Sequence, residues 1–368
     1  MTAPVSTRRL PHPGAVLALI EAELARRLRG RKLQPLPPPH LVGPSETVSC
    51  APGLYEADQI GRVTACGFRG ALPDELAKLD ATVFQEAPLE RYDLGPSLIV
   101  GGRIVTRSAW HLFRDLPRRE VLGDRPHEYG RISLLNSQRG MRYFGHWLRD
   151  DCALHEALRD MPSMSRGELL SMRRAHWPDC AFYETAFGHD WPEVGVARIA
   201  DLTLWRDQGF SRDKAARLRR LRARLRQTGR GENVGQIVYL GRGRHGVARD
   251  MANRDAFETA LQKAGIRVLE PGRGGAELSR QLLDAAMIVT IEGSQASHGV
   301  YNLAEGGAML ILQPPDRFYN PHHEWCRLLG MSYGVVVGKP GAGGFSICPD
   351  EVLRMVDRLV AQERVRDA

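Results

Sequence analysis

The sequence has no apolar run that approaches the roughly eighteen residues needed to cross a membrane. Its N-terminus has early arginines and a short apolar stretch, but Glu21 and Glu23 interrupt that stretch, so no signal peptide is expected. The apolar residues there recur at helical spacing and predict a helix; they are Leu17, Ile20, Leu24 and Leu28. We therefore expect a cytoplasmic protein, and peripheral association with the inner face of the membrane stays open.

Closely spaced cysteine pairs are also missing. The sequence has six cysteines and no C-x-x-C pair; the cysteines are Cys50, Cys66, Cys152, Cys180, Cys326 and Cys348. The spacing excludes the common zinc motifs and a dense disulfide framework, and it favours a reducing compartment.

Lysine is scarce, because it supplies only five of the 51 basic residues of a chain with net charge +8. Arginine makes bidentate contacts to phosphate, which suits a nucleotide-binding protein, but a GC-rich genome that favours arginine codons is the explanation that we prefer for this bias. The hydrophobic content of 43% and charged content of 26% are those of a soluble globular protein. A length of 368 residues accommodates two domains.

The C-terminal half alternates between apolar runs and helical patterns. The expected strands are Ile237 to Leu240, Ile266 to Leu269, Met287 to Ile291, Ala308 to Leu312 and Gly334 to Val337. The expected helices are about 253 to 265, 276 to 286, 296 to 305, 321 to 330 and 349 to 363. This alternation predicts an α/β fold whose parallel sheet is doubly wound, with helices on both faces.

The N-terminal half is less regular. A proline-rich passage, 33 to 44, predicts a linker, and short strands are expected from 45 to 110, including 62 to 66 and 97 to 105 with a turn at Gly101-Gly102. Further strands are expected at 132 to 135 and 196 to 205. The predicted division is 1–44 (helix and linker), 45–227 (first α/β domain), 228–348 (second domain) and 349–368 (C-terminal helix).

An arginine-rich helix is expected over 211 to 226, with Ser211 as its N-cap. Leu218, Leu221 and Leu225 form a narrow apolar stripe, and arginines cover most of the rest. Such a helix suits either nucleic acid or anionic lipid, or it is a solvated helix that leads into the next domain.

The first segment with chemical content is YFGHWLRD, residues 143 to 150. His146 and Asp150 are four residues apart, so they share one face of a helix. The two side chains suit a general-base pair, or Asp150 alone as the base. The alternative is a histidine near the helix start and a solvated aspartate.

Two loops are candidates for binding phosphate. The stretch Met287 to Asp316 predicts a strand, a tight turn at Gly293-Ser294, a helix and a second strand, so that backbone N–H groups at the helix start face a ligand. The loop after the first strand contributes arginines that suit a diphosphate, with an asparagine that could cap the next helix; the residues are Arg242, Arg244, Arg249 and Asn253. Carboxyl ends of parallel strands meet at one edge, so both loops are expected there.

Four further polar residues lie in or beside the predicted helix: Glu292, His298, Asn302 and Glu305. His298 and Asn302 are four apart, so both can face a ligand, and the glutamates can accept hydrogen bonds from a ribose. A packed histidine and structural polar residues are the other interpretation.

Together, YFGHWLRD, YLGRGRHGVARDMAN (239 to 253) and EGSQASHGVYNLAEGG (292 to 307) resemble motifs of glycosyltransferase family 61, over roughly residues 130 to 315. This family includes bacterial capsular-polysaccharide biosynthesis proteins. The resemblance implies a GT-B arrangement of two Rossmann-like domains facing a cleft, and inverting transfer from a nucleotide-sugar, usually UDP-linked, to a glycan acceptor. It implies neither a bound metal nor a cofactor, and no nucleic-acid partner is expected.

Carried over by motif, the resemblance makes Asp150 the base, with His146 beside it, on the acceptor side. It assigns the donor to residues of the other two motifs: Arg242, Arg244, Arg249, Asn253, Gly293, Ser294, His298 and Asn302. Many family members have His-Gly-Ala directly after the strand, where this chain has Gly-Ser-Gln-Ala-Ser-His, so Ser294 is a candidate to replace His298.

Two other functions remain open at this stage. One is another transferase of surface polysaccharide, such as a pyruvyl transferase, which uses similar phosphate loops. The other is a non-enzymatic binder of nucleic acid or a membrane surface through the 211 to 226 helix.

Overall fold

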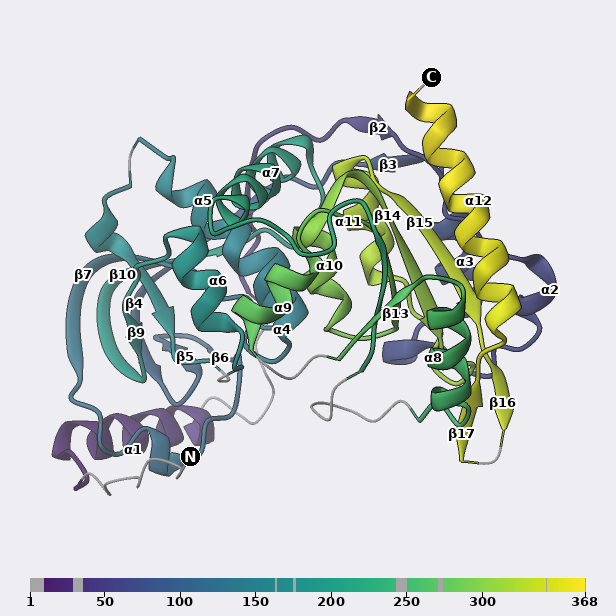
Figure 1. Ribbon diagram of the computed structural model, residues 1–368. Coiled ribbons are helices and arrows are strands. Elements are labelled where there is room, and N and C mark those ends of the chain that lie inside the picture. Colours follow the sequence, from purple (N-terminus) through teal and green to yellow (C-terminus); the bar gives the residue numbers. More distant parts are fainter. Residues whose placement is uncertain are drawn as a thin grey trace. The chain divides into compact units, whose positions relative to one another are not determined.

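The computed structural model describes residues 10–28, 36–162, 164–174, 177–242, 250–270, 274–341 and 343–367. The chain divides into two compact units, each assembled from three separate stretches. The first unit is Met1–Gly43, Pro88–His176 and Asp190–Gly209, and the second is Pro44–Ala87, Trp177–His189 and Phe210–Ala368. Each unit combines a β-sheet with packed helices, so the predicted α/β class is confirmed (Figure 1).

The first unit contains an eight-stranded sheet in the order β6-β5-β4-β10-β7-β8-β9, with β1 also paired to β4. The strands are β1 (His40–Val42), β4 (Leu89–Val100), β5 (Arg103–Thr106), β6 (Trp110–Leu112), β7 (His127–Leu134), β8 (Leu169–Met172), β9 (Glu193–Val194) and β10 (Val196–Arg206). β10, β7, β8 and β9 pair in parallel, while the pairs on the β4 side are antiparallel. The sheet is therefore mixed, and only its parallel half resembles a Rossmann-like arrangement.

Helical segments surround this sheet: α1 (Pro13–Leu28), η2 (Arg118–Glu120), α4 (Phe144–His146), the π-helical η3 (Trp147–Asp151), α5 (Cys152–Arg159) and η4 (Arg166–Glu168). The N-terminal helix is present as expected, but alanines form its buried face: Ala15, Ala18, Ala22 and Ala25. They pack with sheet residues such as Leu98, Val100 and Val105. Small side chains let the helix backbone lie close to the strands.

The second unit contains a five-stranded sheet in the order β12-β11-β13-β14-β15, and every neighbouring pair is parallel. Its strands are β11 (Ile237–Leu240), β12 (Arg267–Leu269), β13 (Ala285–Ile291), β14 (Leu303–Gln313) and β15 (Ser332–Val337). All five match predicted strands. Two small hairpins lie outside it, β2 (Thr47–Ser49) with β3 (Val83–Gln85), and β16 (Lys339–Gly341) with β17 (Gly344–Ser346).

The helical segments of this unit are α2 (Ala57–Ile60), η1 (Gly67–Arg69), α3 (Leu72–Asp80), α6 (Cys180–Phe187), α7 (Arg212–Arg226), α8 (Arg254–Lys263), α9 (Gly275–Leu282), α10 (Ala296–Asn302), α11 (Pro321–Leu329) and α12 (Pro349–Asp367). α8 and α12 cover one face of the five-stranded sheet, and α10 and α11 contact the other (Figure 1). Helices on both faces of a parallel sheet are what the sequence predicted. α10 is shorter than expected, because β14 begins at Leu303.

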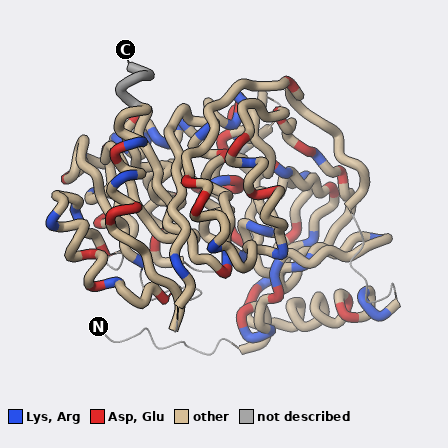
Figure 2. Tube along the Cα trace, turned by 90° about the vertical axis from the view of Figure 1, so that its right-hand side faces the viewer, with Lys and Arg blue, Asp and Glu red and all other residues tan. Residues whose placement is uncertain are grey.

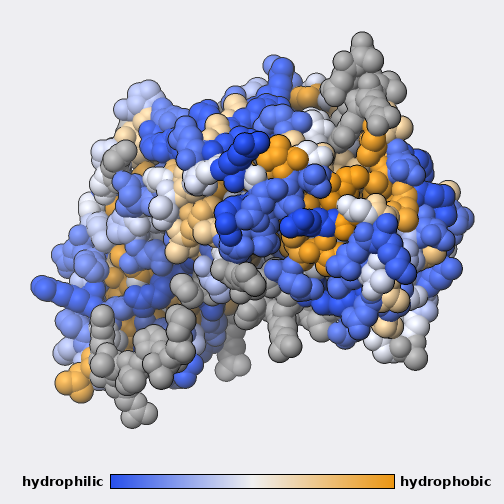
Figure 3. Space-filling model, in the orientation of Figure 1, coloured by the Kyte–Doolittle hydropathy of each residue, from blue (hydrophilic) through white to orange (hydrophobic). Residues whose placement is uncertain are grey.

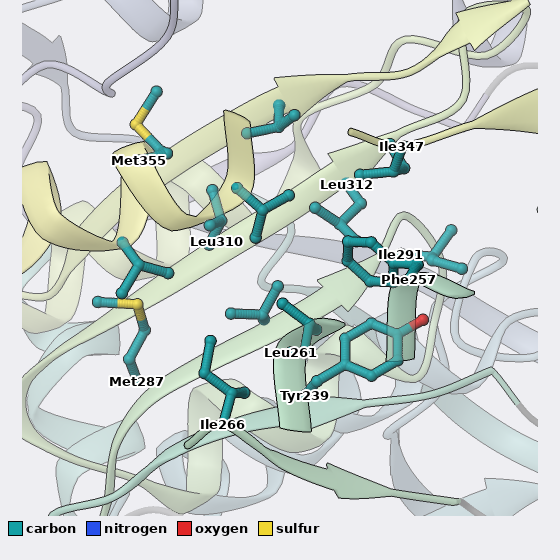
Figure 4. Close-up of a cluster of buried hydrophobic side chains, with 14 of the residues drawn as sticks. Tyr239, Phe257, Leu261, Ile266, Met287, Ile291, Leu310, Leu312, Ile347 and Met355 are labelled. Carbon is teal, nitrogen blue, oxygen red and sulfur yellow. The ribbon is translucent and has the colours of Figure 1, made fainter. Parts of the chain in front are cut away.

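The core between the sheet and α8 and α12 is almost entirely apolar. Phe257 and Leu261 of α8, and Met355 of α12, pack on side chains from the central strands (Figure 4). Figure 3 shows apolar residues gathered beside α12, with hydrophilic residues around them. Every second residue of these strands points into this core, so the continuous apolar runs in the sequence follow from burial on both faces.

The boundaries of the two units differ from the predicted domains. The sequence predicted a first domain that includes three segments of the second unit: 45–87, 177–189 and 210–227. The reason is direct pairing: Leu54 bridges to Gly334 in β15, and Arg62 forms an ion pair with Glu351 of α12 at 2.8 Å. The predicted strand at 62 to 66 is also wrong, because only Cys66 forms an isolated bridge there.

The arginine-rich helix α7 begins as predicted. The Ser211 hydroxyl accepts the backbone N–H of Lys214 at 3.1 Å, and Leu218, Leu221 and Leu225 are fully buried. The arginines were expected in solvent, but several donate to backbone carbonyls of the second unit: Arg219 to Leu328, Arg222 to Val300 and Leu303, Arg224 to Phe187, and Arg226 to Leu303. These arginines are engaged in hydrogen bonds within the second unit, so fewer of them remain available to bind nucleic acid.

Arg222 has the most demanding of these positions, because it is completely buried. Its guanidinium meets the carbonyls of Val300 and Leu303, where α10 ends, and the Glu305 carboxylate at 3.0 Å. Helix C-termini leave carbonyl groups without partners, and a cation also complements the dipole there. Arg222 therefore acts as the C-terminal cap of α10.

We expect Arg222→Met to lower the free energy of unfolding by about 2–4 kcal/mol, because the buried carbonyls lose their donors. Urea unfolding followed by circular dichroism measures this change. Arg220→Met, on an exposed position of the same helix, is the matched control and should cost less than about 0.5 kcal/mol. Equal stability of the two variants would show that the cap is not needed.

No helix in the described ranges is long and apolar enough to cross a membrane. The six cysteines are all free thiols.

Candidate functional site

The strongest cluster of polar side chains in the first unit follows strand β7. The chain passes through the loop after Leu134, forms the short helix α4, and continues as the π-helix Trp147–Asp151 before α5. The helix predicted from about residue 145 is therefore present, but its first part is π-helical. Single π-helical turns are frequent at functional sites, because the wider turn redirects side chains. Here all five residues of the turn are buried.

His146, Arg149 and Asp150 meet in this segment. The Arg149 guanidinium donates to both carboxylate oxygens of Asp150, with Nε to Oδ1 at 2.7 Å and Nη2 to Oδ2 at 2.8 Å. His146 Nδ1 lies 3.1 Å from Asp150 Oδ2 and 2.9 Å from Arg149 Nη2. The expected contact of His146 with Asp150 is therefore present. Arg149 also belongs to this cluster, although the sequence analysis did not predict it.

The two titratable members differ in exposure. The Asp150 side chain is 1% exposed and is enclosed by its partners, whereas the His146 side chain is 14% exposed. Burial lowers the pKa of His146, and the neighbouring Arg149 charge acts in the same direction, against the hydrogen bond from Asp150. His146 is therefore a neutral imidazole near pH 7, which is the form that accepts a proton.

The tautomer of His146 determines which ring nitrogen can accept a proton. If Nδ1 carries the proton, it donates to Asp150 and leaves the Nε2 lone pair as an acceptor. If Nδ1 instead accepts from Arg149, Nε2 carries the proton and cannot act as a base. Asp150 favours the first arrangement, since a carboxylate beside Nδ1 is the usual way to fix that tautomer.

Asp151, the next residue, has a different environment. It is buried and accepts the Ser137 backbone N–H at 3.0 Å through Oδ1, while Oδ2 has no hydrogen-bond partner in the described chain. Burial raises its pKa well above the usual value, and the charge of Asp150 adds to the effect. A Cβ at Gly140 would lie 2.2 Å from Oδ2, so only glycine fits there. Burial therefore favours the neutral form of Asp151, whereas the Arg149 guanidinium favours the ionised form of Asp150.

Residues after β7 and β8 complete the surroundings of the cluster. The Asn136 side chain donates to Ser171 Oγ at 3.0 Å and accepts the Met172 backbone N–H at 2.5 Å, which ties the two strand ends together. The Arg174 guanidinium lies 4.7 Å from the centre of the Trp147 ring. The strand β8 was not recognised in the sequence, so its contribution was missed. The only available signal was the apolar run Leu169-Leu170 followed by Arg173-Arg174.

The raised pKa of Asp151 predicts a specific pH dependence of stability. Its pKa lies above the unfolded value of about 3.8, so the folded state holds a proton that the unfolded state releases, and stability falls as pH rises from about 4 toward the folded pKa. Asp151→Asn stays neutral in both states and removes this loss. We expect the stability of Asp151→Asn relative to wild type to increase with pH, measured by urea unfolding between about pH 4 and 8. A pH-independent difference would mean that Asp151 is ionised in the fold.

In the second unit, the loops after β11 and β13 do meet, as predicted. Arg242, which follows β11, donates through Nη1 to the Glu292 carbonyl at 3.0 Å and to Gln295 Oε1 at 2.9 Å. Gly293 has φ 149°, and a Cβ there would lie 2.2 Å from Arg242 Nη1. The positive φ of Gly293 is the feature that favours glycine here, and the arginine lies close to the position that a Cβ would take. Ser294 is exposed in the same turn.

The start of α10 differs from the expectation of unpaired backbone donors. The N–H groups of Ala296, Ser297 and His298 donate to the carbonyls of Gly293, Ser294 and Gln295. α10 also has only seven residues. These three amides are already used inside the turn, so they are not the unpaired donors that the sequence predicted at the helix start. Arg244 and Arg249 lie outside the described residues.

Asn253 occupies the N-cap position of α8, but its side chain does not cap the helix. Its amide donates to the Ile347 carbonyl at 2.8 Å and accepts the Ile347 N–H at 3.1 Å. The prediction of a side-chain cap is therefore wrong. The side chain instead fixes the segment between β17 and α12.

His298 and Asn302 belong to a buried hydrogen-bond chain rather than to an open surface. Asn302 Nδ2 donates to Tyr183 Oη at 3.2 Å, and Tyr183 Oη lies 2.8 Å from His298 Nδ1. His298 Nε2 lies 3.5 Å from Asp179 Oδ2. Ser279 donates to Asn302 Oδ1 at 2.6 Å. This chain fastens α6 and α9 to α10, which is the packed arrangement that the sequence left open.

The two glutamates beside α10 have protein partners. Glu292 is buried and lies 3.3 Å from Arg317 Nε, at the same sheet edge as Arg242. Glu305 is exposed and pairs with the buried Arg222. Glu305 is therefore part of the α10 cap, while Glu292 and Arg317 add charges next to the Gly293 turn.

No protein-family model matches the chain, and no curated protein matches it.

Proposed function

We propose that this protein is an inverting, metal-independent glycosyltransferase that moves a sugar from a nucleotide-sugar donor, UDP-linked in the simplest case, to a glycan acceptor during cell-surface or capsular polysaccharide synthesis. In this proposal the two α/β units adopt a GT-B arrangement around a shared cleft. The proposal draws on the motif resemblance and on the chemistry of the two clusters described above. It requires no cofactor, because the nucleotide-sugar is a substrate.

The observation that carries the proposal is the dyad of His146 and Asp150 with Arg149. Transfer with inversion needs a group that removes the proton from an acceptor hydroxyl as that oxygen attacks the anomeric carbon. Asp150 has both oxygens engaged by Arg149 and is almost inaccessible, so we assign the base to His146 Nε2. Asp150 then orients the ring through Nδ1 and stabilises the imidazolium that forms. This assignment reverses the roles that the sequence suggested.

The leaving group needs positive charge at the other end of the reaction. As the bond between the anomeric carbon and the phosphate oxygen breaks, the nucleoside diphosphate gains charge, and arginine side chains held in place by the protein can neutralise it. Arg242 is such a residue, because the Glu292 carbonyl and Gln295 fix its orientation at the carboxyl edge of a parallel sheet. Arg317, beside Glu292, is a second candidate at this edge.

The base assignment is tested with purified enzyme and an array of UDP-, GDP- and CMP-sugars. His146→Gln should lower kcat by about 100-fold or more, and Asp150→Asn should also lower it, because the tautomer is no longer fixed. Nucleotide affinity should stay unchanged in both variants. His127→Gln and Asp160→Asn, at exposed positions of the same unit, are the controls. Full activity of His146→Gln would remove it as the base.

The donor site is tested separately by calorimetry with UDP. Arg242→Ala should weaken binding by about tenfold, since a charged hydrogen bond to phosphate is lost. Arg267→Ala, exposed on the neighbouring strand β12, should bind UDP as wild type does. If Arg242→Ala keeps its affinity, the nucleotide does not bind at this edge.

A further inference from the structure

Helix α1 carries a stripe of large apolar side chains on its exposed side. Leu17 is 63% exposed, Ile20 51%, Leu24 52% and Leu28 84%, and Leu10 just before the helix is 88% exposed. Leu17, Ile20, Leu24 and Leu28 are named the leucine stripe below. Large aliphatic side chains at this exposure normally occur singly on a protein surface, whereas these four follow one another at helical spacing.

The stripe lies opposite the face that the helix buries. Residues Ala15, Ala18, Ala22 and Ala25 pack on the sheet of the first unit, and their spacing places them about half a turn away from the leucine stripe. Helix α1 therefore buries its small apolar residues and exposes its large apolar residues, which is the opposite of the usual arrangement. The core of the first unit does not need the leucines, so packing within that unit does not explain them.

Charge on the helix is confined to its C-terminal half. Figure 2 shows the tube of α1 uncharged along its first part, with acidic and basic residues toward its end. Glu23 is bound by both Arg26 and Arg27, and Glu21 is bound by Arg198. The two acidic residues of the helix are thus neutralised by arginines.

Further arginines lie near α1 in the fold. The helix start is held next to the 122–126 segment, since the His12 N–H donates to the Leu122 carbonyl at 2.7 Å. Exposed arginines lie in and just before that segment, at Arg118, Arg119 and Arg125. Arg107, also exposed, lines a cavity of about 440 Å³ together with Glu21 and Ala25 of α1. Within the described ranges, these four arginines form no ion pair.

We propose that α1 is a membrane-docking helix that lies in the surface of an anionic lipid bilayer. The leucine stripe would enter the boundary between headgroups and acyl chains, and the surrounding arginines would contact lipid phosphates. An exposed apolar face bordered by basic residues is the arrangement that interfacial helices use. The proposal is independent of glycosyl transfer, because it uses no residue of either cluster described above.

A second copy of the chain fits this surface less well. A stable protein interface usually involves about 20–30 residues on each side, and the stripe supplies four large side chains. A symmetric pairing of two stripes would also bring the arginines of the two copies together, and like charges oppose such contact. A surface of anionic phosphates is complementary to the arginines, so lipid is the occupant that the charges favour.

The experiment uses the full chain and sedimentation with phosphatidylcholine vesicles that contain either no anionic lipid or about one third phosphatidylglycerol. We expect binding to the anionic vesicles and little binding to the neutral ones. The stripe variant Leu17→Gln/Ile20→Gln/Leu24→Gln should bind at least about tenfold more weakly. Arg118→Gln/Arg119→Gln/Arg125→Gln should reduce the preference for anionic vesicles.

The matched control is Leu41→Gln/Val83→Gln/Val234→Gln, which removes three large apolar side chains of similar exposure elsewhere and should bind as wild type does. Circular dichroism and thermal unfolding check that each variant is folded. Unchanged binding by the stripe variant, or an equal loss in the control, overturns the proposal. A fall in oligomer mass for the stripe variant without vesicles also overturns it, and assigns the stripe to contact between copies.

Discussion

A guanidinium group removed from water needs acceptors in fixed positions, and this constraint governs both units. Arg222 is buried in the second unit because the carbonyls at the end of α10 and Glu305 receive its hydrogens. Arg149 is buried in the first unit because Asp150 accepts from it twice. In each case the cost of burying the guanidinium charge is offset by its hydrogen bonds, which also join separate segments rigidly. Removing one partner would leave the other partner buried without a hydrogen bond. The scarcity of lysine fits this use, since an ammonium group lacks the planar, forked geometry.

The regular half of the fold was predictable because its signal is local. Strands buried on both faces read as continuous apolar runs, so β11 to β15 and the helices between them follow from the sequence alone. The boundaries of the units were not predictable. They depend on Leu54 joining β15 and on Arg62 pairing with Glu351, contacts between residues far apart in the chain. Short elements such as β8 have too few residues to produce a period.

The candidate site was predictable in part for the same reason. The spacing of His146 and Asp150 predicted their contact. The position of two loops at one edge of the sheet predicted that Arg242 would lie close to the Gly293 turn. The sequence did not predict that the Asp150 carboxylate would be occupied by the residue next to it. Nor did it predict that His298 and Asn302 would contact Tyr183 of α6, because no helix was recognised between residues 161 and 195.

Electrostatics explains the different roles that we propose for His146 and Asp150. A carboxylate that accepts two hydrogen bonds from a guanidinium is stabilised as an anion, so it is a weak base, yet its charge still acts on the neighbouring ring. Burial lowers the pKa of His146, and in the proposed reaction its Nε2 takes up a proton to form an imidazolium that Asp150 can balance. Burial raises the pKa of the adjacent Asp151 and so favours its neutral form, which adds no second negative charge beside Asp150. Environments that push the pKa values of neighbouring groups apart mark the acid and base roles of a site, and in the proposed reaction the histidine is therefore the proton acceptor.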